Sequence, residues 1–581
     1  MVWAPFAQSV DLVTPELRVA LHSETSGYWE ADIVETMLDD GYRYSIDGAP
    51  PVPDPRSRWQ PDGVHGASHL AQPLRSSNAS VGATREPTLQ GAVIYEMHVG
   101  TFTPEGTYSA AAAKLPHLVA LGVTHIELMP LATFPGVRGW GYDGVDLFAP
   151  LAAYGTPQQL AAFVDAIHAE GLFVLLDVVY NHLGPDGNYL GQYGPYFTDR
   201  YSTGWGAAMN YDGPHSDGVR RLIIDNALMW LGEYGFDGLR LDAVHAIFSF
   251  DAVHVLEELA VAVKRLGVRL GRTFLLVAES DLNDPRLVRA RRLGGMGLDA
   301  QWADDFHHAI HRFFTGETAG YYADFSGLRD LATALRDGYV YQGQYSVHRH
   351  KRHGRPPTGV APHQLVVFAQ NHDQIGNRAR GERLSMLLEA PQLKAVAALT
   401  LLSPFAALMF QGEEWGAQTP FLYFTDHQDV ELGRLVVRGR SREFSSFEWQ
   451  GAVPNPQALD TFMRSKLDWN ELAQPQSADL FAWHCALIRL RRELLPSGRQ
   501  KPLVQVDAER GWLRVVRGDL CVLTNFAMQA QRVPKPGGEW RTVLRSDNAP
   551  EGAATDTGGC PGDGHMIAGR ATWVLRRIVV D

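Results

Sequence analysis

From about residue 92 onward, short apolar runs alternate with longer stretches of helical character, and this alternation constrains the fold more than any other feature of the chain. Strands that alternate with helices are typical of a parallel sheet, because each crossover needs a helix to return the chain. When eight such strands close on themselves, they form a (β/α)₈ barrel of roughly 250 residues or more. We therefore predict an α/β fold built on a TIM barrel, with strands at 92–99, 123–130, 172–179, 236–243, 273–280, 298–302, 364–370 and 406–412.

Both flanks of the barrel have a different pattern. Before residue 84, alternating stretches such as 10–22 and 31–38 are separated by turn residues, which indicates an antiparallel β-sandwich. Residues 50–66 are dense in proline and glycine and predict an ordered but irregular connector. After a helix at 479–495, which we expect to close the barrel, short strands with Gly and Pro turns return. We predict three domains: an N-terminal β-sandwich (1–83), the barrel (84–496) and a C-terminal β-sandwich (497–581).

Charge and cysteine content exclude several classes of partner. The chain has 52 Lys and Arg against 65 Asp and Glu, a net charge of −13, which argues against nucleic acid and anionic membranes as partners. No apolar run is long enough for a membrane span. The three cysteines, Cys485, Cys521 and Cys560, indicate no disulfide framework, and the first residues lack the pattern of a signal peptide. We therefore expect a cytoplasmic protein.

Four of the predicted strands end in polar side chains. The segments are DVVYNH (177–182), GFDGLRLDAVH (235–245), LLVAES (275–280) and FAQNHDQIGN (368–377). They bring Asp177, Asp242, Glu279 and Asp373 to the carboxyl ends of strands, where the catalytic groups of a TIM barrel lie. A rim of carboxyl groups suits the cleavage of a glycosidic bond, which uses one carboxylate and one carboxylic acid.

The surroundings of these acids predict different roles. Arg240 lies two residues before Asp242 on the same strand face, and a neighbouring guanidinium favours the ionised form that a nucleophile needs. Glu279 follows an apolar run, so we expect desolvation to keep it protonated as the general acid. We expect Asp373 to hold sugar hydroxyls and to distort the ring, and His182, His372 and Tyr142 to contact the sugar.

A structural interpretation of each residue stands beside the catalytic one. A single acid after a strand is more often a helix cap or an ion-pair partner, and a single histidine is more often hydrogen-bonded in the fold. Arg240 could only neutralise a rim acid, and we expect Asp177 to be a structural anchor. The prediction depends on the whole set, because four such strand ends occur in order within one eight-strand pattern.

The four segments resemble the conserved regions of the α-amylase family of retaining glycoside hydrolases and transferases. Within that family, YEMHVGTFTPEGT (95–107) resembles the start of the barrel in branching enzymes and in maltooligosyltrehalose trehalohydrolases. Three further segments, LDAVHAI (241–247), AESDLNDPR (278–286) and AQWADDFHHAIH (300–311), favour the trehalohydrolases, as does the connector PDPRSRWQPDGVHG (53–66). The resemblance implies hydrolysis of the α-1,4 bond next to a terminal trehalose unit of an α-glucan oligosaccharide, with release of trehalose.

The resemblance also implies the residues that bind this substrate. With Asp242, Glu279 and Asp373 as nucleophile, donor and stabiliser, the substrate-binding residues would be Tyr142, His182, Arg240, Leu241, Ala243, Val244, His245, Asp304, Asp305, Phe306, His307, His308, His372, Gln374, Ile375, Gly376 and Asn377. Asp304 and Asp305 also suit a helix cap. Trp302 and Phe306 suit stacking on sugar or, more often, core packing. The loop 183–216 is rich in aromatic residues and is a candidate wall of the cleft.

We expect no cofactor and no essential metal. Asn181 alone is no calcium site, because calcium takes six to eight oxygen ligands. Three other functions stay open: a branching enzyme that passes the same intermediate to a sugar hydroxyl, a debranching hydrolase, and a non-catalytic glucan-binding protein on the same fold. The N-terminal sandwich resembles a glycogen-binding module, although packing against the barrel is the role we favour. The sequence leaves the oligomeric state open.

Overall fold

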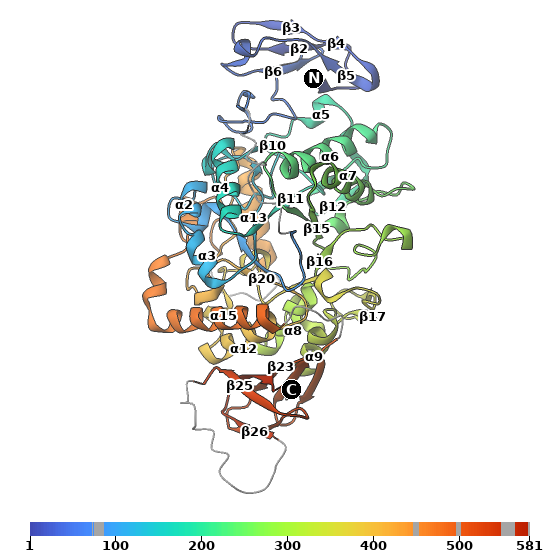
Figure 1. Cartoon of the computed structure of the whole chain (residues 1–581). Helices are drawn as coiled ribbons and strands as arrows, with labels where there is room; N and C mark the ends of the chain where they lie inside the picture. Colours follow the sequence, from blue (N-terminus) through green and yellow to red (C-terminus); the bar gives the residue numbers. More distant parts are fainter. Residues whose placement is uncertain (73, 75–85, 446–452, 495–500, 548–563, 579–581) are drawn as a thin grey trace.

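The computed structural model describes residues 1–72, 74, 86–494 except 446–452, 501–547 and 564–578. Figure 1 shows three regions along the long axis of the molecule: two small sheets near the N-terminus, a central barrel, and a sheet near the C-terminus. The predicted domain limits after residues 83 and 496 lie outside the described residues, and so does Cys560. These limits therefore remain a prediction.

A closed barrel of parallel strands confirms the predicted fold. Its order is β11-β14-β15-β16-β19-β20-β7-β8, so the first strand pairs with the last. Each strand falls within one of the eight predicted runs: β7 (Val93–Met97), β8 (His125–Leu128), β11 (Phe173–Val178), β14 (Gly238–Leu241), β15 (Leu275–Ala278), β16 (Ala300–Trp302), β19 (Leu365–Phe368) and β20 (Ala406–Phe410). All of their residues are buried, which explains why the runs are continuously apolar rather than alternating.

Helices cover the outside of the barrel between the strands (Figure 1). One of them, α7, shows how the sequence sets its ends: Glu257 and Glu258 lie in its first turn, and Gly271 adopts the left-handed conformation after its last residue. The helices are α1 (Val99–Phe102), α2 (Tyr108–Ala112), α3 (Leu115–Leu121), α4 (Pro157–Ala169), α5 (Leu190–Tyr193), α6 (Ser216–Gly232), α7 (Val255–Leu270), α8 (Asp304–Thr315), α9 (Leu328–Asp337), α10 (His372–Gly376), α11 (Leu384–Leu387), α12 (Ala390–Leu401), α13 (Val430–Ser445), α14 (Leu459–Met463) and α15 (Pro475–Leu494).

One step of the barrel lacks the expected helix. Between β15 and β16 the only helical element is a short 3₁₀ helix, Arg291–Leu293. Pro285 and the glycines Gly294 and Gly297, both with positive φ, interrupt this segment. The long helix expected at 479–495 is present as α15 and packs on α12 and α3, as a closing helix should.

Among the described residues, three hairpins leave the barrel on its loops. They pair β9 (Ala132–Thr133) with β10 (Asp146–Pro150), β12 (Phe197–Thr203) with β13 (Gly206–Met209), and β17 (Gln342–Ser346) with β18 (Lys351–Gly354). The second of these lies in the aromatic loop 183–216, so this loop has regular structure.

The N-terminal region contains two three-stranded antiparallel sheets, as predicted for a sandwich. The orders are β1-β5-β4 and β3-β2-β6, with β1 (Val2–Trp3), β2 (Val10–Val13), β3 (Arg18–Ala20), β4 (His22–Ser23), β5 (Tyr28–Glu30) and β6 (Arg43–Ile46). The strand expected in 31–38 is absent, and Glu35–Leu38 is a 3₁₀ helix. Val34 and Met37 are exposed there, so no sheet face buries the alternating apolar side chains.

Aromatic side chains join the N-terminal sheets to the loop 183–216. The indole of Trp3 meets the ring of Tyr196 edge-on at 5.1 Å between centroids. The hydroxyl of Tyr193 donates to the carbonyl of Pro53 over 2.7 Å. Tyr193 and Tyr196 of this loop are therefore buried against the N-terminal sheets and the connector.

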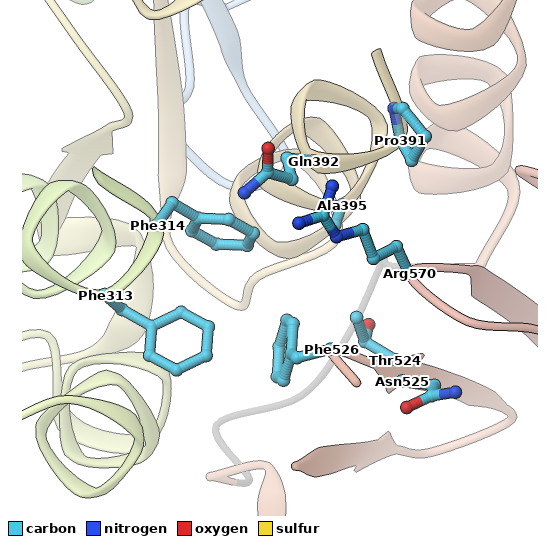
Figure 2. Close-up of a pocket in the computed structure, with 9 residues that line it drawn as sticks. All are labelled: Phe313, Phe314, Pro391, Gln392, Ala395, Thr524, Asn525, Phe526 and Arg570. Atoms are coloured by element: carbon cyan, nitrogen blue, oxygen red, sulfur yellow. The ribbon is translucent and has the colours of Figure 1, made fainter. Parts of the chain in front are cut away.

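The C-terminal region is a five-stranded sheet, β21-β22-β23-β27-β25, beside the pair β24-β26. The strands are β21 (Leu503–Asp507), β22 (Trp512–Arg517), β23 (Leu520–Asn525), β24 (Gln531–Pro534), β25 (Trp540–Arg545), β26 (Gly564–Ile567) and β27 (Thr572–Arg577). Figure 2 shows its junction with the barrel, where Phe526 lies 4.6 Å from Phe313 and 5.7 Å from Phe314 between ring centroids. Among the residues that the structure describes, no helix has the length and apolar character needed to cross a membrane.

Candidate active site

The predicted acids meet at one end of the barrel because each follows the carboxyl end of a strand. Asp242 follows β14, Glu279 follows β15, and Asp373 is the second residue of α10, which begins shortly after β19. Asp177 lies on β11, next to Arg240 in the register between β11 and β14.

Arg240 lies at the centre of the site and is fully buried, with 0% of its side chain exposed. Its Nη1 donates to Oδ1 of Asp242 over 2.8 Å and to Oδ2 of Asp177 over 2.8 Å. The guanidinium stands over the ring of Trp302, 4.2 Å from its centroid, inside the barrel. The buried cation thus pairs with both carboxyl groups through charge-assisted hydrogen bonds. Trp302 is therefore a core residue under Arg240 rather than a platform for sugar.

Glu279 is held beside Asp242 by the backbone between them. The N–H of Ala243 donates to Oε2 of Glu279 over 2.6 Å, and Nη2 of Arg240 lies 3.9 Å from the same oxygen. Burial raises the pKa of Glu279 well above its ordinary value, against the lowering effect of Arg240, and the charges of Asp242, Asp304 and Asp373 raise it further. The carboxyl group therefore favours the protonated form that a general acid needs.

Ala243 has a strained backbone at this point. Its φ of 37° and ψ of 50° lie in the left-handed region, which a residue with a Cβ rarely adopts. This conformation turns the chain from β14 into the 3₁₀ helix Val244–Ala246 and aims the N–H of Ala243 at Glu279. His245, on that 3₁₀ helix, is exposed at the rim.

Tyr142 and His372 connect the acids to one another. The hydroxyl of Tyr142 donates to Oδ2 of Asp177 over 2.6 Å and lies 2.7 Å from Nε2 of His372. The two rings stack at 5.1 Å. Asp177 thus binds both Tyr142 and Arg240, in keeping with the anchoring role expected for it.

Asp373 is the most exposed of the three proposed catalytic acids, with 44% of its side chain accessible. Its Oδ1 accepts a hydrogen bond of 3.3 Å from Nδ2 of Asn377, one turn further along. Arg440, from α13, donates to Oδ1 of Asn377 and to the carbonyl of Gly376, so a distant helix braces this end of α10. The sequence contains no pattern that links Arg440 to the site.

His182 carries an aromatic neighbour at the rim. Its ring stacks on Trp205 at 4.7 Å with an angle of only 7° between the planes, and its Nε2 contacts the carbonyl of Tyr142 over 3.0 Å. Burial lowers the pKa of His182, although Asp242 and Asp143 raise it, so the neutral ring is favoured. Trp205 is 53% exposed, between β12 and β13, and is the one aromatic residue of the loop 183–216 that stacks on a predicted site residue.

The segment 304–308 divides into a rim residue and buried residues. Burial, followed by the charges of Asp281, Asp373 and Asp305, raises the pKa of Asp304 to about 7, which places its carboxyl among the rim acids. Asp305 is buried, and its Oδ2 accepts from Nδ2 of Asn283 (2.8 Å) and from two backbone N–H groups (both 2.7 Å). Asp305 therefore supports the neighbouring loop, and its role in substrate binding stays a prediction.

Several other side chains predicted to bind substrate are also buried. His307 contacts the carbonyl of Ala369 and the hydroxyl of Tyr322, and burial lowers the pKa of His308 to about 3. The substrate-binding role of this group stays a prediction, although all of its members are buried: Leu241, Ala243, Val244, Phe306, His307, His308, Ile375 and Gly376. Gln374 is half-buried and Asn377 is exposed, so both remain candidates.

Two buried acids on the barrel strands were missed. Glu96 on β7 contacts His372, and Glu127 on β8 lies opposite Glu96 in the register. An acid within an apolar strand run is the signal that could have singled out both. Among the described residues, no group of three or more His, Cys, Asp or Glu is arranged to hold a metal ion.

The chain is similar to known proteins over nearly its whole length. Residues 75–201 match the family described as alpha amylase, catalytic domain. The malto-oligosyltrehalose trehalohydrolase of Rhizobium sp. (strain M-11) is 48% identical over 94% of this chain and 94% of that protein. The 1,4-alpha-glucan branching enzyme GlgB of Rhodopseudomonas palustris is 26% identical over 98% of this chain and 78% of that enzyme.

A comparison with solved structures also finds a similar protein over nearly the whole chain. A crystal structure described as a putative alpha amylase from Salmonella typhimurium has a TM-score of 0.89 and 38% identity, and the match covers 99% of this chain and 97% of that one.

Proposed function

Because the chain belongs to the malto-oligosyltrehalose trehalohydrolases, within the α-amylase family, we propose that its barrel rim hydrolyses the α-1,4-glucosidic bond next to a terminal trehalose unit. The products are free trehalose and a shortened α-glucan. The enzyme is a glycosidase, and its reaction serves the formation of trehalose.

The mechanism is a double displacement with retention of configuration. Asp242, hydrogen-bonded by Arg240, attacks the anomeric carbon while Glu279 protonates the departing glycosidic oxygen. The resulting glycosyl ester is hydrolysed by water, and Glu279 then acts as the base that removes its proton. Asp373, exposed toward the cleft, binds the sugar hydroxyls as the ring flattens.

One observation supports these roles above the others. The backbone N–H of Ala243, the residue after Asp242, donates to Glu279 over 2.6 Å, which holds the two residues side by side at the ends of neighbouring strands. Retaining enzymes place their two carboxyl groups close together, at about 5–5.5 Å, because no water has to fit between nucleophile and sugar. Arg240 hydrogen-bonds Asp242 and lies 3.9 Å from Glu279, and burial favours the neutral form of Glu279, which suits the role of the acid.

The trehalose end of the substrate is the finer part of the proposal. His245 and Asp304 flank the catalytic pair, and Trp205 offers an exposed ring beside His182. Hydroxyl-binding groups and one aromatic face suit a neutral disaccharide. The branching enzyme of 26% identity uses related substrates by name, and a transferase would differ only in the group that accepts the intermediate.

Product analysis separates these functions. The protein is incubated separately with maltohexaose and with maltotetraosyl-trehalose, and the products are resolved. We expect fast release of trehalose from the second substrate and slow attack on the first. Comparable cleavage of both, or new α-1,6 branches on a longer glucan, would assign the protein to another activity of the family. Asp242→Asn, which keeps the fold, should show none of these products and thereby controls for contaminating enzymes.

We also propose a cytoplasmic location. Within the described part of the chain, Cys485 and Cys521 are free thiols, and few cysteines without disulfides suit a reducing compartment. Fractionation of cells that express the protein at its natural level is the direct test.

A further inference from the structure

A buried carboxylate inside the barrel contacts the helix that carries Asp373. Glu96, on β7, is 1% exposed. Its Oε2 accepts the backbone N–H of His372 over 3.0 Å, and its Oε1 contacts Nδ1 of the His372 ring. Both oxygens of one carboxylate therefore engage the first residue of α10, and Asp373 is the next residue. A buried charge without a partner is costly, so these two groups depend on each other.

The hydrogen bonds around His372 determine where its protons are. Burial raises the pKa of Asp177 to about 6, against the lowering effect of Arg240, so Asp177 is ionised at neutral pH and only accepts hydrogen bonds. Tyr142 must therefore donate its one hydroxyl proton to Asp177. The Tyr142 oxygen then accepts from Nε2 of His372, while Nδ1 donates to Glu96. Both ring nitrogens of His372 carry a proton.

These contacts make one continuous chain from the barrel interior to the proposed nucleophile. Its members, each hydrogen-bonded to the next, are Glu96, His372, Tyr142, Asp177, Arg240 and Asp242. Charged members alternate in sign along the chain, with the neutral Tyr142 between His372 and Asp177. Loss of the negative charge of Glu96 would therefore change the electrostatic environment of Asp242 at the other end of this chain of contacts.

We propose that Glu96 is a positioning residue for the hydrolysis: it holds His372 as the doubly protonated imidazolium and fixes the start of α10, so that Asp373 faces the cleft and Tyr142 stays bonded to Asp177. Glu96 does not touch the substrate and acts through His372. The proposal rests on the proposed glycosidase function.

Other charged groups also face His372. They are Asp373, Arg240, Asp177, Glu127, Tyr142 and His98. Burial lowers the pKa of the His372 ring, but Glu96 and then Asp373 outweigh burial and raise it to about 9, against a lowering effect of Arg240. Since Glu96 is the largest of the raising effects, its charge decides whether the imidazolium persists at neutral pH.

Glu96→Gln removes that charge and keeps the shape of the side chain. Its amide oxygen can still accept the backbone N–H of His372. Burial then lowers the pKa of His372 with only Asp373 left to raise it, so we expect the ring to lose one proton at a lower pH than in the wild type. The amide NH₂ group then faces Nδ1 of the neutral ring and donates to it, so the ring keeps its one proton on Nε2 and its bond to Tyr142. What the variant loses is the positive charge between Glu96 and Asp373, which orients Asp373 at the start of α10.

Glu127 offers a matched control. It lies opposite Glu96 in the register between β7 and β8, and it is equally buried at 1% exposure. Neither of its carboxyl oxygens has a hydrogen-bond partner among the described residues. Burial raises its pKa well above the ordinary value, which favours the neutral form, so Glu127→Gln makes the same substitution in the same layer with little change of charge.

The test is the pH profile of kcat/KM on maltotetraosyl-trehalose for the wild type, E96Q, E96D and E127Q. In E96Q we expect the alkaline limb to move at least about one pH unit toward acid, with a loss of at least about tenfold near pH 8 and much less near pH 5. E96D keeps the charge and should keep the limb, and E127Q should match the wild type. An unchanged limb in E96Q, or the same shift in E127Q, would overturn the proposal.

A double variant keeps the proposal testable if E96Q folds poorly. His372→Gln alone leaves the Glu96 carboxylate buried without its cation, whereas E96Q/H372Q pairs two neutral amides. The thermal midpoint of the double variant should exceed that of H372Q, and adding E96Q to H372Q should cost no further activity. If E96Q and H372Q reduced activity independently, so that their losses added in the double variant, the proposal would be overturned. Turnover by the wild type tests the proposed function, whereas the ratio of variant to wild type across pH tests this proposal.

Discussion

The backbone N–H of Ala243 donates a 2.6 Å hydrogen bond to Oε2 of Glu279, so the residue after the proposed nucleophile holds the proposed general acid. The left-handed conformation of Ala243 makes this contact possible. Nucleophile and acid come from neighbouring strands, and one strained residue sets their relative position. Strain retained at such a point is paid for by the surrounding fold and is typical of functional sites.

Substitution of Ala243 tests this coupling. Ala243→Val places a β-branched side chain in the left-handed region, so we expect a loss of about 1–3 kcal/mol of stability and a clear fall in kcat. Ala243→Gly adopts the same conformation without strain and should keep both. Thermal unfolding and steady-state kinetics of the two variants measure the effect. Equal stability and equal kcat of the Val and Gly variants would show that the backbone conformation of residue 243 is unimportant.

Glu279→Gln removes the transferable proton but keeps an acceptor for the N–H of Ala243. We expect kcat to fall by about 10²–10⁴ with the fold intact. Because the raised pKa of Glu279 keeps it protonated at neutral pH, the wild type should lose activity as pH rises through that pKa. The residual activity of the Glu279→Gln variant should not show this fall as pH rises. A variant with substantial activity and an unchanged profile would remove Glu279 from the role of acid.

Glu127 should make stability depend on pH. Its folded pKa is raised well above 4.5, mainly by burial, so its contribution is fully present below the unfolded value and is lost as pH rises through the folded value. Glu127→Gln should therefore gain stability relative to the wild type as pH rises from acid to alkaline. Thermal midpoints of both proteins at several pH values measure the difference, which a constant offset would contradict.

The ion pair of Glu317 and Arg378 ties the end of α8 to the segment after α10. Both guanidinium Nη atoms of Arg378 donate to Glu317 over 2.8 Å, and Glu317 is 36% exposed. Allowing for this exposure, Glu317→Gln should cost about 0.5–1 kcal/mol.

The pH dependence of this pair follows from its electrostatics. Burial raises the pKa of Glu317, but the hydrogen bonds from Arg378 and His311 outweigh burial and lower it. The stabilisation is thus present above the ordinary pKa and is lost as pH falls through the lowered value. The two proteins should become equally stable in acid. A gap that persists there would mean that packing, not charge, accounts for the cost.

Trp205 should contribute to substrate binding through its stack on His182. Trp205→Ala removes an exposed ring from the rim, so we expect KM to rise by about three- to tenfold with a smaller change in kcat. Trp205→Phe keeps an aromatic ring, so its KM should lie between those of the wild type and the alanine variant. Kinetics on maltotetraosyl-trehalose decide the question, and an unchanged KM in the alanine variant would exclude Trp205 from the binding surface.

The barrel could be predicted because its signal is local. Strands such as 364–370 are buried on both faces, so each is visible as an apolar run between turn residues. The strand-end acids could be predicted for the same reason, since their place follows from the end of a run. The prediction of a strand at 31–38 was wrong because alternation alone does not show whether a sheet face covers the apolar side chains.

Contacts that depend on barrel closure could not be predicted. Glu96 and His372 are 276 residues apart and meet because β7 pairs with β20 at the closing seam. Ala243 gives no local sign of a positive φ, since its neighbours would suit a regular strand end. The tyrosines of 183–216 were visible, but which of them face sugar depends on the position of the N-terminal sheets.

The contact between Trp3 and Tyr196 links the beginning of the chain to its chemistry. Tyr196 directly precedes β12, the first strand of the hairpin that sets Trp205 on His182. The N-terminal sheets thus support the hairpin that places Trp205 beside His182. Loss of that support would weaken sugar binding before it unfolds the chain, so the affinity of the enzyme for its substrate reports on the packing of its N-terminal sheets.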